Sequence, residues 1–335
     1  MRPRLDPVVA DLRRRVRAAL QDLEPGDLVL VACSGGPDSL ALAAVTCFEA
    51  RRAGYRSGAV VVDHDLQEGS AAVSAAVAST LRGLGTEPVE VVRVDAVTPP
   101  GGPEGGARRD RYAALGEASA RLRAAAVLLG HTLDDQAETV LLGLARGSGA
   151  RSLAGMRPVN GIYRRPFLGV TRQATVATCR LLGLEPWHDP HNDDPRYQRV
   201  RVRRTVLPVL EAELGPGIAA ALSRTAELLA ADADALDALA RDALADCRRD
   251  GPAAGPAALV ADRLIALPGA VRSRVLRLAA LGAGCPAGDL TAGHITALEH
   301  LLVTGRGASV ADLPGRVRAR RDRDGIVFAA GPVAG

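Results

Sequence analysis

Four short runs of apolar residues alternate with longer stretches of helical spacing in the first part of the chain. The apolar runs cover residues 28–33, 59–64, 89–94 and 126–131. Between them, Ala, Leu and Arg recur at helical spacing over roughly 38–53, 70–84 and 107–122. Strands that are apolar throughout and alternate with helices are typical of a parallel sheet covered on both faces. The pattern predicts an α/β fold with a doubly wound parallel sheet, which binds ligands at the carboxyl ends of its strands.

The pattern changes after residue 171, where helices dominate. We expect a helix over 171–183, a short strand at 185–188 and a further helix over 202–214. Gly-Pro-Gly at 215–217 indicates a domain boundary, followed by a long amphipathic helix over 223–244 and a hairpin over 315–329. The chain is therefore predicted to divide into a domain of residues 1–215 and a smaller, mainly helical domain of residues 216–335.

Composition narrows the class of protein. The 335 residues are 47% hydrophobic but only 2% aromatic, so the cores must be built from Leu, Val and Ala, with the lone Trp187 expected in a core. No run of about twenty apolar residues occurs, and the basic N-terminus lacks the features of a signal peptide. We therefore expect a cytoplasmic protein without a membrane span. The oligomeric state is open, a homodimer included.

The spacing of the cysteines and the absence of lysine argue against several kinds of site. The five cysteines are scattered and form no Cys-x-x-Cys pair, which disfavours zinc ribbons, iron–sulfur sites and thioredoxin-type centres. The chain contains no lysine, so a Walker A lysine is excluded. The net charge is only +4, and affinity for a polyanion must come from local clusters such as the five arginines of residues 196–205. A solvated helix face is the simpler interpretation of that cluster.

The turn Ser34-Gly35-Gly36-Pro37-Asp38-Ser39 joins the first predicted strand to a helix. Both glycines would let the main chain approach a ligand and adopt φ values closed to other residues, and proline suits the first helical position. Backbone N–H groups and two serine hydroxyls form a cradle for phosphate. Asp38 would repel phosphate unless a cation lies between them, and Mg²⁺ is the natural one. A plain capped turn is the alternative.

This turn resembles the SGGxDS signature of the PP-loop, or N-type ATP pyrophosphatase, family. The resemblance implies that ATP is cleaved between its α- and β-phosphates. It also implies that the loop holds the phosphates without a Walker A lysine, with Ser34, Gly35, Gly36, Pro37, Asp38 and Ser39 as nucleotide-binding residues.

A second polar segment follows the fourth predicted strand. His131 ends the strand, Thr132 can cap a helix, and acidic residues follow in its first turns. Asp135 and Glu138 are three residues apart, so their carboxylates can meet on one helix face and suit an ammonium group or a metal. Charge complementarity with the helix dipole explains any one of these acids alone.

Taken together, several segments resemble the tRNA(Ile)-lysidine synthetase family. They are "HTLDDQAETVLLGLARGSG" (131–149), "GGPEGGARRDRYAAL" (101–115), "RPFLGVTR" (165–172) and "DPHNDDPRYQRVRVRRTVLPVL" (189–210). The resemblance implies that ATP adenylates C2 of the wobble cytidine in a tRNA(Ile) with the anticodon CAU. The ε-amine of L-lysine then displaces AMP, and the resulting lysidine shifts decoding from AUG to AUA.

The resemblance also assigns roles by position. Asp135 and Glu138 would bind the amino groups of lysine, and Asp38 would lie near magnesium. Arg108 and Arg111 would lie near the phosphate or the transition state, although a basic helix surface would also explain them. Asp63, His64 and His131, at strand ends, would contact the nucleotide, with plain strand-end polarity as the alternative. His188 and His191 suit loop packing or tRNA contact better than zinc.

Two other functions stay open on the sequence. The protein could be another PP-loop tRNA-modifying enzyme, such as a thiolase, which would need paired cysteines. It could also be a non-catalytic nucleotide- or RNA-binding relative, which would predict damage in the phosphate loop or in the acidic pair.

Overall fold

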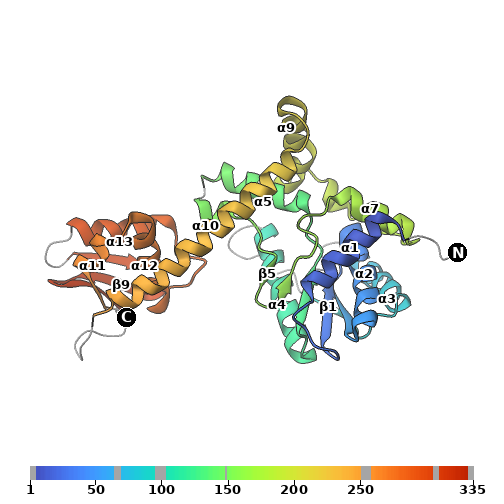
Figure 1. The fold of residues 1–335 in the computed structure, drawn as a ribbon, viewed down its shortest axis with the longest axis horizontal. Helices are drawn as coiled ribbons and strands as arrows, with labels where there is room; N and C mark the ends of the chain where they lie inside the picture. Colours follow the sequence, from blue (N-terminus) through green and yellow to red (C-terminus); the bar gives the residue numbers. More distant parts are fainter. Residues whose placement is uncertain are drawn as a thin grey trace. The chain divides into compact units, whose positions relative to one another are not determined.

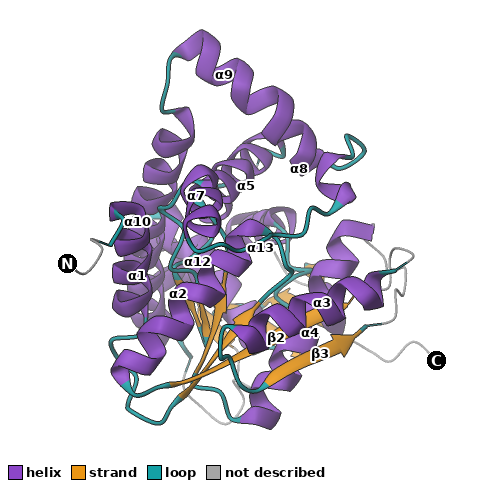
Figure 2. Ribbon diagram, turned by 90° about the vertical axis from the view of Figure 1, so that its right-hand side faces the viewer, coloured by secondary structure: helices purple, strands orange, loops and turns teal. Residues whose placement is uncertain are grey.

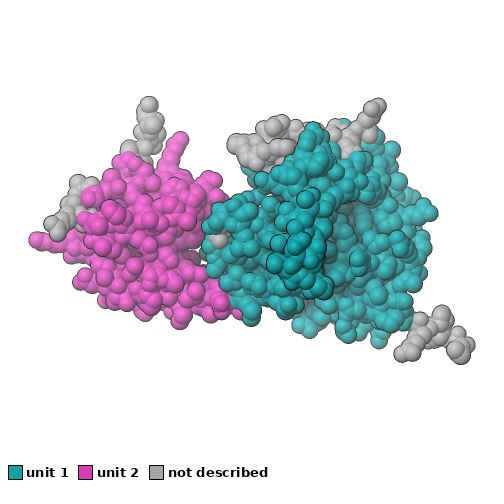
Figure 3. Space-filling model, turned by 90° about the horizontal axis from the view of Figure 1, so that it is seen from above, with its two compact units in different colours: residues 1–230 teal, residues 231–335 magenta. Residues whose placement is uncertain are grey.

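The computed structural model describes residues 5–63, 69–94, 103–147, 149–249, 258–304 and 309–330. The chain forms two compact units, residues 1–230 and 231–335 (Figure 3). The long helix α10 (Ile218–Cys247) contributes residues to both units. The functional boundary expected after residue 215 stays a prediction.

The first unit contains the predicted strands and helices. Its strands are β1 (Leu28–Ala32), β2 (Arg56–Asp63), β3 (Val89–Arg93), β4 (Ala126–Leu129), β5 (Val159–Asn160) and β6 (Tyr163–Arg164). Its helices are α1 (Pro7–Ala19), α2 (Pro37–Ala53), α3 (Ser70–Gly83), α4 (Pro103–Leu122), α5 (Leu133–Ala145), α6 (Ala150–Leu153), α7 (Arg172–Leu181), α8 (Gln198–Arg201) and α9 (Leu207–Leu214). A 3-10 turn covers Pro190–Asp193, and a π-helical turn over Val202–Val206 joins α8 to α9 (Figure 1).

The sheet of this unit has the strand order β3-β2-β1-β4-β6-β5. Strands β1 to β4 and β6 pair in parallel, and the short β5 pairs antiparallel with β6. The chain runs outward from β1 through β2 to β3 and then returns to place β4 on the other side of β1. In such sheets the ligand site lies where the strand order reverses, so the segments that follow β1 and β4 face the expected site.

Alternate residues of the central strands enter two different cores, which is why the strands read as continuous apolar runs. Val29 and Val31 of β1 pack with residues of α1, α2, α3 and α7. Leu28 and Leu30 instead pack with Leu115 of α4 on the opposite face. Figure 2 shows α3 and α4 beside strands β2 and β3. Helices therefore cover both faces, and the predicted doubly wound sheet is confirmed.

The second unit is mainly helical and carries a small antiparallel sheet. Helices α11 (Ala261–Ala266), α12 (Gly269–Gly282) and α13 (Ala292–Thr304) pack on the end of α10 and on strands of the order β7-β10-β9-β8. The strands are β7 (Ala258–Val260), β8 (Val310–Leu313), β9 (Val317–Arg321) and β10 (Gly325–Ala330). The predicted hairpin is β9–β10, in which Arg321 pairs with Ile326.

Two expectations from the sequence are wrong. Residues 185–188 form no strand, because the backbone N–H of Trp187 donates to the carbonyl of Gly35 at 3.0 Å instead of to a neighbouring strand. Trp187 is half-buried and lines the site described below, so it does not belong to a core.

No single helix of the described ranges is long and apolar enough to cross a membrane. One pair of helical segments, Gln198–Leu214 and Ile218–Cys247, meets that criterion only when joined across a 98° bend, by length and composition alone.

Candidate nucleotide and amine site

The turn after β1 is shaped by its first glycine. Gly35 has a φ of +84°, and a Cβ atom there would stand 2.5 Å from Cγ2 of Val77. Only glycine fits both conditions. Gly36 has an ordinary φ of −68°, so the expectation that both glycines need unusual φ values is wrong for Gly36.

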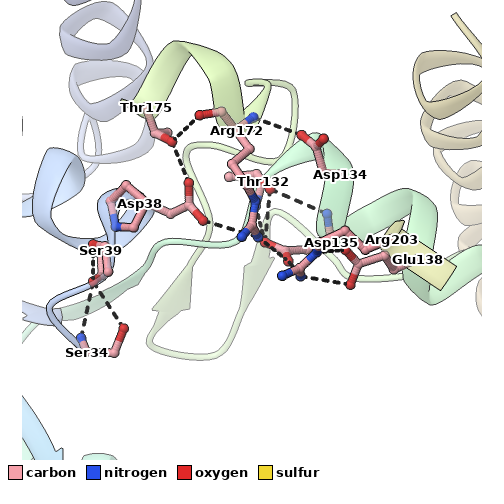
Figure 4. Close-up of polar contacts among 12 residues, drawn as sticks. Ser34, Asp38, Ser39, Thr132, Asp134, Asp135, Glu138, Arg172, Thr175 and Arg203 are labelled. Atoms are coloured by element: carbon pink, nitrogen blue, oxygen red, sulfur yellow. Dashed lines mark hydrogen bonds and ion pairs between the residues drawn. The ribbon is translucent and has the colours of Figure 1, made fainter. Parts of the chain in front are cut away.

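The two serines of the turn fix its conformation. Oγ of Ser39 accepts a hydrogen bond from the backbone N–H of Ser34 at 3.2 Å and donates to the carbonyl of Gly36 at 3.1 Å. The two hydroxyl oxygens lie 3.3 Å apart (Figure 4). Helix α2 begins at Pro37, directly after the turn. The turn therefore presents its backbone at a helix N-terminus, where anions bind favourably.

Strand β4 ends against this turn at Gly130, a residue that was not among the predicted site residues. A Cβ atom on Gly130 would stand 3.0 Å from both the Cα and the N of Ser39. The absence of a side chain thus lets the end of β4 touch the first turn of α2. The sequence does contain a sign of this close contact, since a glycine stands directly before His131 at the end of an apolar run.

A pocket of about 390 Å³ opens between the ends of β1 and β4. Its wall contains most of the predicted site residues, together with residues of the segment 187–203. The lining residues that matter here are Ser34, Gly36, Pro37, Asp38, Ser39, Arg108, Arg111, His131, Asp135, Arg172, Trp187, Arg199 and Arg203. Asp63 is buried at the end of β2 and is not part of the described pocket wall. His64 lies outside the described residues.

The acidic segment begins α5 with a capping box. Oδ2 of Asp135 accepts from the backbone N–H of Thr132 at 2.8 Å, and the hydroxyl of Thr132 caps the N–H of Asp135 in return. This reciprocal pair starts the helix and fixes the rotamer of Asp135. The neighbouring Asp134 accepts from the backbone N–H of Arg172 at 2.8 Å and so holds the start of α7.

Asp135 and Glu138 converge on one cation, and that cation is Arg203 (Figure 4). Nε and Nη2 of Arg203 donate to the two carboxylate oxygens of Glu138 at 2.6 and 3.1 Å. Nη2 also lies 3.3 Å from Oδ1 of Asp135. The carboxylates therefore meet on one helix face, as their spacing predicts, and together they hold a positive group.

A second arginine links the acidic segment to the turn after β1. Nη2 of Arg172 lies 3.3 Å from Oδ2 of Asp38 and 3.2 Å from Oδ1 of Asp135. The hydroxyl of Thr175, also on α7, contacts Oδ1 of Asp38 at 2.5 Å. Helix α7 thus positions the one carboxylate of the phosphate turn. Neither contact could be predicted from the sequence, because a hydroxyl and an arginine on a distant helix carry no local signal.

Burial and the arginines set the protonation of the three acids. Burial raises the pKa of Asp38 and of Glu138, and the nearby Arg172 and Arg203 offset it only in part. Burial also acts to raise the pKa of Asp135, but Arg172, the Thr132 N–H and Arg203 outweigh it and lower this pKa overall. Asp135 is therefore the most strongly ionised of the three.

The other side of the pocket is basic. The guanidinium carbons of Arg108 and Arg111 lie 5.2 and 5.7 Å from the ring centre of Tyr112. Burial lowers the pKa of Arg111, and its Nε has no hydrogen-bond partner among the described residues. Such a group favours a bound anion.

His131 adds an uncharged imidazole to the pocket wall. Burial lowers its pKa to about 3. Its Nδ1 is buried without a partner in the described part of the chain. His131 is therefore uncharged near neutral pH.

Metal-ligating residues do not cluster in the described ranges: no group of three or more His, Cys, Asp or Glu side chains could hold a metal ion. His188 instead pairs with Asp193 at 2.9 Å. The five cysteines are free and buried. A single carboxylate such as Asp38 fits Mg²⁺, which usually takes one or two protein oxygens and completes its shell with phosphates and water.

A doubly wound parallel sheet with a lysine-free SGGxDS turn defines a protein of the PP-loop class, which uses ATP. The PP-loop domain model matches residues 9–210, and the TilS substrate binding domain model matches residues 259–326. Individual relatives identify the family within this class. The tRNA(Ile)-lysidine synthase of Thermobifida fusca is 58% identical over 324 residues, which are 97% of this chain and 98% of that protein. The chain belongs to the tRNA(Ile)-lysidine synthase family.

Other comparisons agree with this assignment. The tRNA(Ile)-lysidine synthase of Streptomyces coelicolor is 54% identical over 312 residues, covering 92% of this chain and 87% of that protein. Among solved structures, the U34-tRNA thiolase NcsA from Methanococcus maripaludis matches with a TM-score of 0.56 and 21% identity, over 66% of this chain and 78% of that one. At that identity the likeness shows the fold alone. The family expected from the sequence motifs is confirmed, and with it a ligase-type, tRNA-modifying enzyme.

Proposed function

We propose that this protein joins L-lysine to C2 of the wobble cytidine of a tRNA(Ile) with the anticodon CAU, at the expense of ATP, in the cytoplasm. The observation that carries the proposal is the convergence of Asp135 and the fully buried Glu138 on Arg203, which lines, with Asp135, the pocket that contains the Ser34–Ser39 turn. This supports an amine site and a phosphate site that open into one cavity.

In the first step, the O2 atom of the cytidine attacks the α-phosphorus of ATP, and pyrophosphate leaves. The backbone of the Ser34–Ser39 turn and the hydroxyl of Ser34 hold the phosphates. Arg108 and Arg111 compensate the negative charge that develops there. Asp38 would hold Mg²⁺ together with the phosphates, and the ion would supply further charge neutralisation.

In the second step, the ε-amine of lysine attacks C2 of the cytidine, and AMP leaves with the former O2 atom. The attacking amine must be uncharged, so a proton passes to a neighbouring carboxylate. Glu138, whose pKa is raised by burial, suits this role. Asp135 stays ionised and holds an ammonium group of the substrate. His131, neutral in the pocket, contacts the nucleotide.

The second unit, which the TilS substrate binding domain model matches over residues 259–326, is proposed to bind the tRNA. Binding through arginine should weaken as salt concentration rises. A homodimer is also part of the proposal, and a light-scattering mass of a single chain at assay concentration would contradict that part.

The test is incorporation of labelled lysine into CAU-anticodon tRNA with ATP and Mg²⁺. We expect Asp135→Asn and Glu138→Gln each to lower the rate by about 100-fold or more, the usual scale for loss of a proton acceptor or charge stabiliser. The matched control is Glu117→Gln, an exposed acid on α4, which should change the rate less than twofold.

Two outcomes would contradict the proposal. Pyrophosphate release that depends on tRNA but incorporates no lysine would favour another PP-loop enzyme. Full lysine incorporation by both variants would show that these carboxylates do not hold the amine.

A further inference from the structure

Arg203 occupies the place that the proposed function gives to an amino group of lysine. Its guanidinium makes a two-point contact with Glu138 and reaches Asp135 with the same Nη2 atom. Arg203 and an ammonium group therefore compete for the same carboxylate oxygens. Lysine can enter only as this guanidinium leaves.

The backbone that carries Arg203 departs from an ordinary α-helix. Val202–Val206 form a π-helical turn in which the N–H of Leu207 bonds to the carbonyl of Val202. Pro208 follows this turn in the first positions of α9. It has no N–H, and in a regular α-helix its ring would clash with the carbonyl four residues earlier, so it disfavours α-helical hydrogen bonding at this point. Single π-helical turns are frequent at functional sites. Here the turn places Arg203 over α5.

Charge balance decides when Arg203 can leave. The Glu138 side chain is 0% exposed, and its hydrogen bonds within the described residues all go to Arg203. A buried carboxylate left without a cation is strongly destabilised. Exchange of the guanidinium for an ammonium group leaves the charge beside Asp135 and Glu138 unchanged, so these carboxylates can accept lysine in place of Arg203 at little cost.

The released guanidinium then needs an anion of its own. Arg203 lines the same pocket as Ser34, Gly36 and Ser39, so a phosphate held on that turn lies within the cavity that Arg203 already faces. Arg172 is already paired with Asp38 and Asp135, so these carboxylates are not free to receive the guanidinium of Arg203. Arg108 and Arg111 line the same pocket. Without nucleotide, their positive charges repel the guanidinium of Arg203 and so oppose its movement away from the carboxylates.

We propose that Arg203 couples the two small substrates: a bound nucleotide attracts its guanidinium away from Asp135 and Glu138 and thereby opens the amine site for lysine. This inference rests on the proposed function, because it takes lysine as the amine. It adds an order of binding to that function: ATP binds first, and lysine occupies the amine site only afterwards. By linkage, lysine must tighten nucleotide binding by the same factor.

The experiment measures the dissociation constant of labelled lysine by equilibrium dialysis, without tRNA. It is run with and without a saturating ATP analogue that this reaction cannot cleave, because a methylene group replaces the oxygen between the α- and β-phosphates, plus Mg²⁺. We expect the analogue to tighten lysine binding to the unmodified protein by about 5- to 100-fold, the usual range of coupling between sites. In Arg203→Gln, lysine should bind more tightly without the analogue, and the analogue should change its affinity less than twofold.

Three controls make the result specific. Arg180→Gln removes the same charge from the exposed end of α7 and should keep the full coupling. Arg203→Lys keeps a cation at the position and should keep part of it. Circular dichroism and the melting temperature show whether Arg203→Gln is folded. If it is not, Arg203→Lys and the coupling in the unmodified protein decide the question.

The possible failures can be told apart. Equal lysine affinity with and without the analogue in the unmodified protein overturns the coupling but leaves the proposed function intact. Coupling that survives undiminished in Arg203→Gln assigns it to another residue and also overturns the inference. If the unmodified protein binds no lysine under either condition, the proposed function fails, and the inference fails with it.

Discussion

Gly130 packs directly against the backbone of Ser39, with the position of its absent Cβ only 3.0 Å from the Cα atom of that serine. This contact joins the end of β4, after which the chain continues into α5 with Asp135 and Glu138, to the first turn of α2, which follows the proposed phosphate turn. The distance between the two proposed sites therefore depends on a residue that has no side chain to bind either substrate.

Gly130→Ala should disturb this junction. The new methyl group meets backbone atoms that cannot rotate away, so we expect a loss of about 1–3 kcal/mol in the free energy of unfolding and a weaker binding of ATP. Urea unfolding and nucleotide binding measure the two effects. The control is Gly83→Ala, where no atom lies within 4 Å of the added Cβ. Equal stability of the two variants would show that the junction tolerates the methyl group.

The two glycines of the phosphate turn should differ sharply. Gly35→Ala combines a φ of +84° with a Cβ 2.5 Å from Val77, whereas the nearest atom to a Cβ on Gly36 is 3.7 Å away. We expect Gly35→Ala to lower the melting temperature by several degrees, in line with about 1–3 kcal/mol. Gly36→Ala should leave it nearly unchanged. Similar melting temperatures would contradict this distinction.

Two buried threonines on α7 offer a matched comparison. The hydroxyl of Thr175 contacts Asp38, while that of Thr178 is buried without a partner among the described residues. Thr175→Val should therefore cost about 1 kcal/mol and raise KM for ATP, because Asp38 loses a positioning contact. Thr178→Val should be neutral or stabilising. A KM for ATP that is the same in both variants would exclude a role of Thr175 in holding Asp38.

The buried histidine predicts a dependence of stability on pH. Burial lowers the pKa of His131 to about 3 from an ordinary 6.5. Between these values the unfolded chain binds a proton that the folded chain does not. The free energy of unfolding should therefore fall as pH falls from about 6.5 towards 3, by at most about 1.4 kcal/mol per pH unit.

His131→Gln isolates this contribution. The carboxylates titrate in both proteins, so the difference between their urea-unfolding curves at pH 7 and pH 5 reports the histidine alone. The unmodified protein should lose more stability than His131→Gln over this interval. Parallel losses would mean that His131 is protonated in the folded protein.

The sequence predicts those parts of the fold that depend on local pattern. Strands β1 to β4 and the turn at Ser34 are predicted from runs of neighbouring residues, and all of them form. Strand β5 (Val159–Asn160) and strand β6 (Tyr163–Arg164) are two residues long, too short to produce a periodic signal. The segment 185–188 has the composition of a strand, but the backbone bond from Trp187 to Gly35 replaces strand pairing.

The ion pairs of the site could not be predicted in the same way. Arg172 lies 37 residues from Asp135, and Arg203 lies 65 residues from Glu138. Neither distance corresponds to a helical or strand period. In the sequence, Arg203 is one of five arginines in a basic segment, where a solvated face is the simplest interpretation. Its pairing with Glu138 becomes visible only in the structure, where α5 and the π-helical turn lie side by side.

The complete burial of Glu138 against Arg203 bears on how this site can change through evolution. Replacing either residue alone strands the opposite charge in the protein interior, so single replacements at these two positions should be rare. Among relatives, the acid and the base should instead be kept or lost together, and a homologue that has given up both would be expected to have given up its amine substrate as well.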